Sequence, residues 1–381
     1  MNILEVTPQL RRGAGTVVTK LSESLVQRGH KLTVVTSGDV DDLLEWPELH
    51  KKLEELSIKH HYISVFKRES YLVWEAVEQM AQLLEENPFD IVHVHSGVPA
   101  FIVKNAMKRI DRHIPILATF HSWGATRPHW MNIADTVALN ECDEIVYDSF
   151  EYIQIAKGFG VRKTEKVIYP FVTVDQLKLT NELDSYKEKF RIPKDAKIIT
   201  HLGEVTDKKG QLDLIKVLKE VRQTFDAYVI LVGQCRDEAY LAEINQYLKE
   251  NNLEKYVIMT GWVDDALSII KGSDAFVFPS YSEGLGMAIV EAALCGVPVT
   301  FTYHEGMKDI ADILGDKGFG TFALGNINEM AERTLSILNM DSSIKSNKIK
   351  QINNILLEKF SLEKMVTEYE ELMNKMISIK E

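Results

Sequence analysis

The sequence predicts an α/β protein with two doubly wound domains. Short β-rich runs alternate with amphipathic helical patterns, which is typical of βαβ units and a parallel sheet. The chain has 381 residues, and beyond about 250 residues a single hydrophobic core usually stops growing. The alternation is interrupted near residues 170–197 and then begins again. We therefore expect two halves joined by a linker.

The first half begins with a strand at residues 3–6 and a glycine-containing turn at residues 13–15. Apolar residues at 17, 18, 21 and 25 then keep helical spacing, and Gly29 stands where that helix should end. Further strands are expected at residues 32–36, 91–94, 116–118 and 144–147.

The predicted linker contains Pro170 and Pro193, and its second part, residues 184–197, is strongly charged. Beyond it, strands are expected at residues 198–202, 228–232, 256–260, 275–278 and 297–301. The helix after Gly210 has an apolar stripe made of Leu214, Ile215, Leu218 and Val221. Residues from 352 onward are expected to be helical throughout. Two such halves predict a cleft, because ligands bind beyond the carboxyl ends of the strands in these sheets.

The composition excludes some classes of partner. The net charge of −12 argues against nucleic acid, which demands a basic footprint, and allows at most weak peripheral membrane contact. The basic stretch 104–112 is a candidate for a lipid headgroup or a phosphorylated acceptor, although a solvated helix face is the commoner role of so short a run.

The ends and the cysteines indicate a cytoplasmic protein. The N-terminus has neither the basic flank nor the cleavage site of a signal peptide. No apolar stretch approaches the roughly 20 residues that cross a bilayer. Cys142, Cys235 and Cys295 are far apart and odd in number, so we expect buried free thiols.

Two glutamates flank a pair of glycines in the most informative stretch, residues 273–299. A strand should end at Pro279, and a polar loop carrying Glu283 should lead through Gly286 into a helix that contains Glu291. On a fully helical path the two carboxylates would lie about 12 Å apart, roughly the reach from a sugar ring across a diphosphate to a ribose. Amides at the helix start favour an anion there. A Gly-x-Gly turn alone is common, but a buried Glu291 needs a partner.

This stretch resembles the E-x7-E signature of the retaining GT-B glycosyltransferases, family four, group 1. That family includes bacterial mannosyl- and N-acetylglucosaminyltransferases and is similar to glycogen synthase. The resemblance covers nearly the whole chain and implies two Rossmann-like domains facing across a cleft. It implies that Glu283 binds donor-sugar hydroxyls and that Glu291 binds the ribose. The amides of Gly284, Leu285 and Gly286 would then bind the diphosphate.

Other stretches of the second half support the resemblance. Residues 203–210 resemble the loop that opens the second domain of such enzymes, where Lys209 would pair with the diphosphate. Residues 260–263 resemble the loop whose backbone reads the base, so Trp262 and Val263 are expected contacts. Trp262 could stack on a ligand, although a packed core tryptophan is the more frequent outcome.

The first half resembles the acceptor-binding domain. Gly13 and Gly15 match the glycine-rich loop whose amides face the phosphates and the acceptor. His121 matches the strand-end histidine that contacts the donor sugar, which places it with Glu283 and Lys209 as a catalytic residue. His95, which closes an earlier strand with His93, is a weaker candidate for the same cleft. The resemblance implies two domains. Residues 1–178 would form the acceptor-binding domain, which a terminal crossover helix at 362–381 joins, and residues 190–360 would form the domain that binds the nucleotide-sugar.

The sequence also departs from the family pattern. Glu204 stands where an arginine usually clamps the diphosphate, and Arg12 replaces the first glycine of its loop. Our hypothesis is that Arg12 or Lys208 supplies the missing positive charge. Residues 168–172 lack the usual Asn-Gly turn, and Asp309 replaces a glutamate.

The resemblance implies transfer of a hexose or N-acetylhexosamine from a UDP- or GDP-sugar to a hydroxyl of a glycan or small molecule, with retention. No cofactor or metal is expected. Asp39 and Asp41 imitate a metal-binding Asp-x-Asp but fall in a polar loop, and no His or Cys cluster has ligand spacing. A non-catalytic subunit that binds glycan or a partner protein is the alternative, favoured by Glu204. A nucleotide-sugar epimerase has less support.

Overall fold

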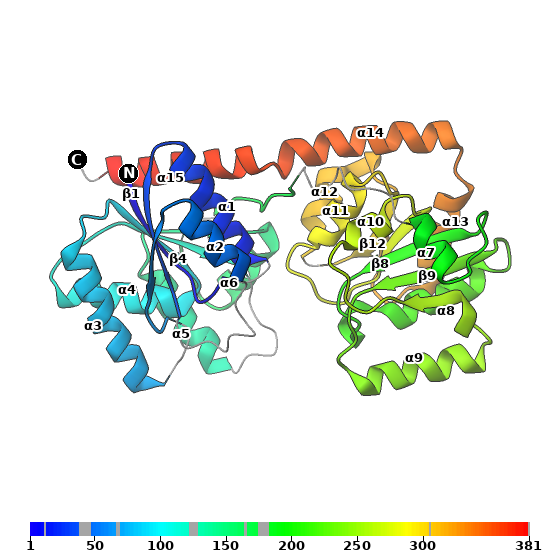
Figure 1. Ribbon diagram of the computed structural model, residues 1–381, viewed down its shortest axis with the longest axis horizontal. Helices are drawn as coiled ribbons and strands as arrows, with labels where there is room; N and C mark the ends of the chain where they lie inside the picture. Colours follow the sequence, from blue (N-terminus) through cyan, green and yellow to red (C-terminus); the bar gives the residue numbers. More distant parts are fainter. Residues whose placement is uncertain are drawn as a thin grey trace. The chain divides into compact units, whose positions relative to one another are not determined.

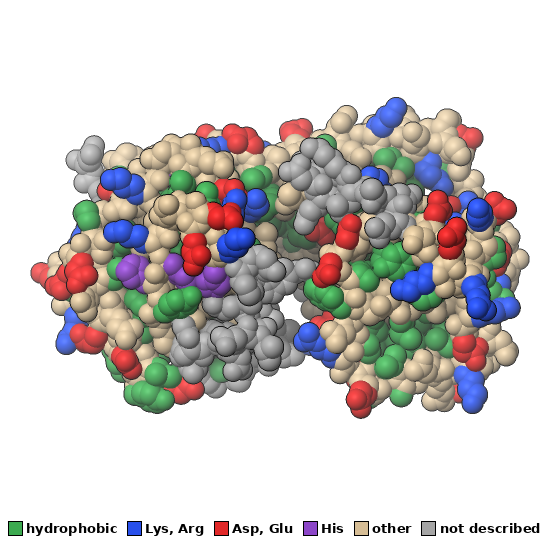
Figure 2. Space-filling model, in the orientation of Figure 1, with side chains coloured by type: hydrophobic (Ala, Val, Ile, Leu, Met, Phe, Trp, Pro, Cys, Tyr) green, Lys and Arg blue, Asp and Glu red, His purple; other side chains and the backbone are tan. Residues whose placement is uncertain are grey.

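The computed structural model describes residues 1–10, 13–37, 47–65, 69–121, 129–163, 166–173, 183–304 and 306–379. The chain forms two compact units, residues 1–171 with 360–381 and residues 172–359 (Figure 1). Each unit is described by itself. Among the described residues, none of the helices is long and apolar enough to cross a membrane. Lysine and arginine are interspersed with acidic side chains on the face shown in Figure 2, without a continuous basic stripe there.

The first unit contains a seven-stranded parallel sheet in the order β3-β2-β1-β4-β5-β6-β7. Its strands are β1 (Asn2–Val6), β2 (Lys31–Thr36), β3 (Lys59–Tyr62), β4 (Ile91–His95), β5 (Ile116–Phe120), β6 (Glu144–Tyr147) and β7 (Lys166–Val167). The chain builds the sheet outward from β1 on one side and from β4 on the other. The topological switch point, where ligands bind in such sheets, therefore lies between β1 and β4.

Helices cover both faces of this sheet and bury a core on each. They are α1 (Ala14–Gln27), α2 (Pro47–Glu55), α3 (Ser70–Glu86), α4 (Gly97–Arg109), α5 (His129–Asn140), α6 (Phe150–Gly158) and α15 (Leu362–Ser378). The last helix lies beside α1 and packs Met365, Tyr369 and Met373 onto the same core as Leu21 and Leu25 (Figure 1). The C-terminal end of the chain is thus part of the first unit.

The second unit contains a six-stranded parallel sheet in the order β10-β9-β8-β11-β12-β13. Its strands are β8 (Lys197–Leu202), β9 (Ala227–Val232), β10 (Val257–Met259), β11 (Ala275–Phe278), β12 (Val299–Tyr303) and β13 (Thr321–Ala323). Its helices are α7 (Leu183–Lys189), α8 (Gln211–Val221), α9 (Glu238–Glu250), α10 (Ala266–Ile270), α11 (Met287–Leu294), α12 (Lys308–Leu314), α13 (Ile327–Asn339) and α14 (Ser342–Lys359), with short 3-10 turns at Asp207–Lys209, Glu254–Tyr256 and Gly315–Lys317. Its switch point lies between β8 and β11.

The predicted fold class is confirmed, with local corrections. The charged stretch 184–197 is not a plain linker: it contains most of α7, and Leu183 and Ile192 are buried in the core of the second unit. The C-terminal helix is not continuous, because α14 ends at Lys359 and the Ser361 hydroxyl caps α15 by accepting from the Lys364 N–H.

Two smaller predictions also change. The strand expected at 297–301 lies at Val299–Tyr303, after Pro298, which has no N–H to give to the sheet. All three cysteines are free thiols, but only Cys142 is buried, so the expectation of burial is wrong for Cys235 and Cys295.

Candidate functional site

A lysine and a glutamate from two loops meet at the switch point of the second unit. Lys209 follows β8 in a 3-10 turn, and Glu283 lies in the loop after β11, so each comes from a strand that borders the switch point. The Lys209 ammonium donates to the Glu283 carboxylate, and the two side chains are about a quarter and a seventh exposed. The pair is therefore both preformed and open to a ligand.

Glycines let the loops of this site touch through their backbones. A Cβ at Gly210 would lie 2.2 Å from the Pro279 carbonyl oxygen, and one at Gly306 would lie 2.1 Å from that of Glu283. The Tyr281 N–H also donates to the Lys208 carbonyl at 2.7 Å. These contacts leave no room for side chains, so they fix the loops after β8 and β12 against the loop after β11.

The helix after this loop begins at Met287, directly after Gly286, as the sequence pattern predicts. Gly286 is the N-cap of α11 with φ 72°, Leu285 is buried before it, and Gly284 lies in the loop. The path from Glu283 to Glu291 is therefore only partly helical, and the separation of about 12 Å expected for a fully helical path does not apply. The first N–H groups of a helix lack intrahelical partners, so α11 offers donors next to Lys209 and Glu283.

Glu291 is a partly buried acid without a counter-charge. Within the described residues, its carboxylate has neither an ion pair nor a hydrogen bond, and burial raises its pKa to about 7. An ionised carboxylate in such a place is stabilised by any ligand whose hydroxyl groups donate hydrogen bonds to it. That Glu291 needs a partner stays a prediction, since none is found for it among the described residues.

Replacing Glu291 by glutamine should change how stability depends on pH. The pKa of about 7 in the folded chain lies above the ordinary glutamate value of 4.5, so the glutamate destabilises the fold progressively as pH rises from about 4.5 to 7. The full cost above pH 7 is about 3 kcal/mol. Glu291→Gln should therefore gain stability relative to the wild type between pH 5 and pH 8, as measured by urea unfolding. Parallel pH profiles for the two proteins would contradict this assignment.

Glu204 has its own counter-charge. Its exposed carboxylate lies 3.9 Å from Nε of Arg236, which follows β9. The two loops are held together by a bridge between Val205 and Cys235. Arg236 was not among the predicted site residues, whereas Arg12 lies outside the described residues and the Lys208 side chain is exposed. The feature that favoured a non-catalytic protein is thus offset by a neighbouring cation.

The remaining predicted residues lie at other strand ends. Trp262 and Val263 follow the edge strand β10; Trp262 is 57% exposed and donates to Asp264 at 3.2 Å, so it is not a core tryptophan. In the first unit Gly13 is the N-cap of α1 with φ 78°. Gly15 cannot carry a side chain, because its Cβ would lie 2.8 Å from the backbone of Leu10. Asp39 and Asp41 lie outside the described residues.

His121 lies directly after β5 and uses both of its ring nitrogens. Nδ1 lies 2.9 Å from Oδ2 of Asp148, and Nε2 lies 3.0 Å from Nδ1 of His95, whose ring plane is nearly parallel to that of His121. Burial acts to lower the pKa of His121, but the charge and the hydrogen bond of Asp148 raise it overall. His121 and His95 are therefore brought together, while the place of His95 in a donor cleft stays a prediction.

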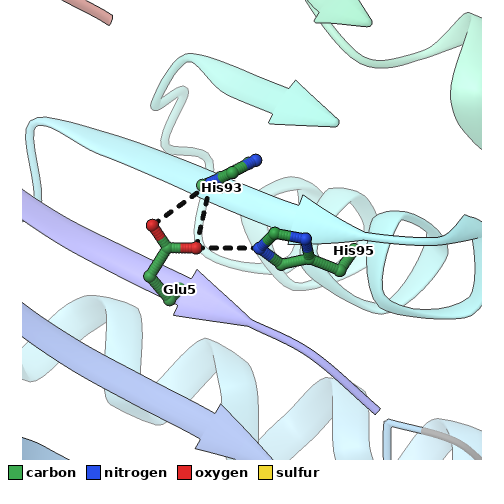
Figure 3. Close-up of side chains that lie close together, drawn as sticks. All are labelled: Glu5, His93 and His95. Carbon is green, nitrogen blue, oxygen red and sulfur yellow. Dashed lines mark hydrogen bonds and ion pairs between the residues drawn. The ribbon is translucent and has the colours of Figure 1, made fainter. Parts of the chain in front are cut away.

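A buried acid joins the two histidines of β4 (Figure 3). The Glu5 carboxylate of β1 lies 2.9 Å from Nδ1 of His93 and 2.9 Å from Nε2 of His95. Burial would raise the pKa of Glu5, but His93 and His95 lower it to about 2. Burial and the neighbouring His93 lower the pKa of His95 to about 3. Glu5 was missed, although a charged residue two positions after Ile3 in an apolar strand was a usable signal.

Glu5, His93 and His95 also have the composition of a metal site, which the sequence spacing did not reveal. One donor atom from each lies within 4.8 Å of the others. Both oxygens of Glu5 and all four ring nitrogens already have hydrogen-bond partners, among them Thr119 and His121. The geometry therefore does not require an ion, and proton placement alone accounts for it.

Comparison with known proteins gives matches along both units. The model of the family "Glycosyl transferases group 1" matches residues 183–354, and that of "Glycosyltransferase Family 4" matches residues 11–176. N-acetyl-alpha-D-glucosaminyl L-malate synthase of Bacillus anthracis is 25% identical over 94% of this chain and 92% of its own length. 2-Deoxystreptamine N-acetyl-D-glucosaminyltransferase of Niallia circulans is 22% identical over 88% of this chain and 90% of its own.

Solved structures show the same fold at low identity. A glycosyltransferase of Rickettsia africae superposes with a TM-score of 0.83 at 20% identity, covering 99% of this chain and 98% of that chain. HepE of Anabaena, solved in complex with UDP, has a TM-score of 0.81 at 17% identity, covering 98% of this chain and all of that chain. The two parallel sheets and these neighbours establish the GT-B architecture with two Rossmann-like domains.

Proposed function

Because this chain belongs to the glycosyl transferases of group 1, family 4, we propose that it moves a hexose or N-acetylhexosamine from a nucleoside-diphosphate sugar to a hydroxyl acceptor. We further propose retention at the anomeric carbon. The observation that carries the proposal is the Lys209–Glu283 pair at the switch point, next to the start of α11. It combines a cation and amide donors for phosphate with a carboxylate for sugar hydroxyls.

Donor binding would divide this ion pair between two parts of the substrate. The ammonium of Lys209 and the amides at the start of α11 would take the diphosphate, whose charge grows as the sugar leaves. The carboxylate of Glu283, released from Lys209, would accept hydrogen bonds from hydroxyl groups of the sugar. The carboxylate of Glu291 would accept hydrogen bonds from the ribose hydroxyls. These hydrogen bonds would lower the pKa of Glu291, which burial raises in the unliganded chain.

These groups supply the charge stabilisation without an ion. Lys209 and a helix start together offer the positive potential that metal-dependent enzymes take from a divalent cation. We therefore propose a metal-independent transferase. Turnover that is unaffected by a chelator would agree with this, whereas turnover restored only by a divalent cation would oppose it.

The relatives suggest which substrates to try first. The names of both relatives described above contain an N-acetylglucosaminyl group. One name joins this group to L-malate, and the other joins it to 2-deoxystreptamine. The structural neighbour HepE was solved both with UDP and with UDP-glucose. They support UDP-N-acetylglucosamine as the first donor, with hydroxy acids and aminocyclitols as acceptors.

A thermal-shift screen against UDP- and GDP-sugars should identify the donor. A ligand at about 100 times its dissociation constant adds about 2.7 kcal/mol of stability, or roughly 5–10 °C in Tm for domains of this size. The donor found should then release its nucleoside diphosphate when an acceptor is added, and product NMR should show the donor's anomeric configuration. No shift with any nucleotide-sugar would contradict the proposal.

A further inference from the structure

The hydrogen bonds around Glu5 and His121 continue in both directions and form one chain across the first unit. In order, its members are Tyr369, Thr119, His93, Glu5, His95, His121 and Asp148. Tyr369 comes from α15 and lies 2.9 Å from the hydroxyl of Thr119, which lies 2.7 Å from Nε2 of His93. Four adjacent strands and the terminal helix thus share one polar network.

Strand alternation explains why these side chains share a face. The core under α1 and α15 contains one apolar residue from each of the four strands, namely Ile3, Ile91, Leu117 and Val146. Side chains two positions later on a strand point to the same face. Those positions are occupied by Glu5, His93, Thr119 and Asp148, and two positions further on by His95 and His121. The network is therefore the polar, carboxyl-end continuation of an apolar core.

The position of each proton in the central part follows from Glu5. An ionised carboxylate only accepts hydrogen bonds, so Nδ1 of His93 and Nε2 of His95 must both carry protons. His95 is neutral at pH 7, because its pKa is lowered to about 3. Its Nδ1 therefore has a lone pair, and the contact of 3.0 Å requires His121 to donate from Nε2.

The other nitrogen of His121 faces a second acid. An ionised Asp148 also only accepts, so the contact of 2.9 Å requires a proton on Nδ1 of His121. His121 then carries protons on both nitrogens. The groups that face it are Asp148 from the end of β6 and His95 from β4, with Glu5 and Tyr369 beyond them.

We propose that Glu5, His95 and Asp148 are positioning residues that hold His121 as a doubly protonated ring. The inference rests on the proposed function for its meaning: both N–H groups of His121 are donated to Asp148 and His95, so the ring has no lone pair with which to deprotonate the acceptor hydroxyl and acts on the substrate through its positive charge. The rate of sugar transfer should therefore fall as pH rises and His121 loses its proton. A histidine that acted as a base would show the opposite dependence on pH.

Imidazole nitrogen shifts test the proton placement without any activity. Deuterated protein labelled with 15N-histidine and treated with a chelator should show, at pH 7.5, two protonated nitrogens for His121 and the Nε2–H tautomer for His95. An ordinary histidine one unit above its pKa of about 6.5 would be about 90% neutral. Signals are assigned by their loss in His121→Gln and His95→Gln. A neutral His121 would overturn the proposal, even if the transferase activity is as proposed.

Glu5→Gln tests whether Glu5 sets the protonation state of His121. A carboxamide can donate to Nε2 of His95, which moves the proton of His95 to Nδ1 and turns that nitrogen into a donor to His121. The variant should have a neutral His121 at pH 7.5 and a kcat at least tenfold lower, with the donor KM within twofold. Tyr369→Phe, at the far end of the network, is the matched control and should leave the His121 signals unchanged.

Two outcomes would reject this role of Glu5. A doubly protonated His121 in Glu5→Gln would show that Glu5 does not set its state. Addition of Zn²⁺ that shifts His95 to the Nδ1–H form would show that the three residues around Glu5 bind a metal, because a ligating Nε2 carries no proton. If Glu5→Gln fails to fold, the wild-type spectrum alone decides.

Discussion

Replacing Lys209 by alanine should lower the rate of sugar transfer by about 10²–10³-fold, the usual cost of removing one preorganised donor to a developing negative charge. Lys209 is the cation that contacts Glu283 at the switch point of the second sheet. Its loss removes the charge opposite the departing diphosphate and leaves the carboxylate of Glu283 without its partner. Both effects oppose donor binding and turnover, which should be measured as kcat and kcat/KM for nucleotide release.

Lys208 provides the matched control for this prediction. It is adjacent in sequence and has the same charge, but its side chain is exposed and makes no contact with Glu283 among the described residues. Lys208→Ala should therefore stay within about threefold of the wild type, since a single exposed charge contributes little. Equal losses in the two variants would mean that the general basic potential of the loop matters, and not the Lys209–Glu283 geometry.

Gly306→Ala should have the second large effect, on both stability and donor binding. The added Cβ would lie 2.1 Å from the carbonyl oxygen of Glu283, a distance that requires the backbone of that turn to move. The left-handed conformation, φ 73°, adds about 1 kcal/mol for a non-glycine residue. We expect a total loss of about 3 kcal/mol in the free energy of unfolding, together with a donor affinity at least tenfold lower, measured by urea unfolding and calorimetry.

Gly296→Ala separates conformational strain from the clash. Gly296 has φ 83°, and a Cβ there meets nothing within 4 Å. The variant should lose only about 1 kcal/mol and bind the donor normally. Similar losses for the two alanine variants would show that the contact between Gly306 and Glu283 does not hold the site.

The strands that the sequence predicted are those with apolar runs, and the ones it missed are edge strands. The three unpredicted strands, β3, β7 and β13, all lie at the edge of a sheet. An edge strand has one neighbour and is less buried, as in Lys59–Tyr62, where no side chain is fully buried. Its sequence therefore lacks the apolar pattern. The helix α7 was missed for a related reason, since charged residues separate Leu183 from Tyr186 and Phe190, which pack on the core.

The candidate residues of the two units differed in how far the sequence could predict them. Glu283 and Glu291 lie in one short motif, so the resemblance found them, and Lys209 was found in its own loop. The partners of His121 depend on strand register and on the packing of α15, which no local pattern encodes. Asp148 and Tyr369 were therefore missed, and Arg236 was missed because its contact with Glu204 joins two loops.

Calorimetric titration of UDP and of GDP tests most directly whether the Lys209–Glu283 site holds the diphosphate of a sugar donor. We expect one of the two nucleotides to bind the wild-type protein at a single site. Its affinity should fall at least tenfold in Lys209→Ala, the cost of one charge-assisted hydrogen bond, and remain unchanged in Lys208→Ala. Absence of saturable binding of either nucleotide at millimolar concentration, or equal affinity for wild type and Lys209→Ala, would contradict the assignment of the donor site.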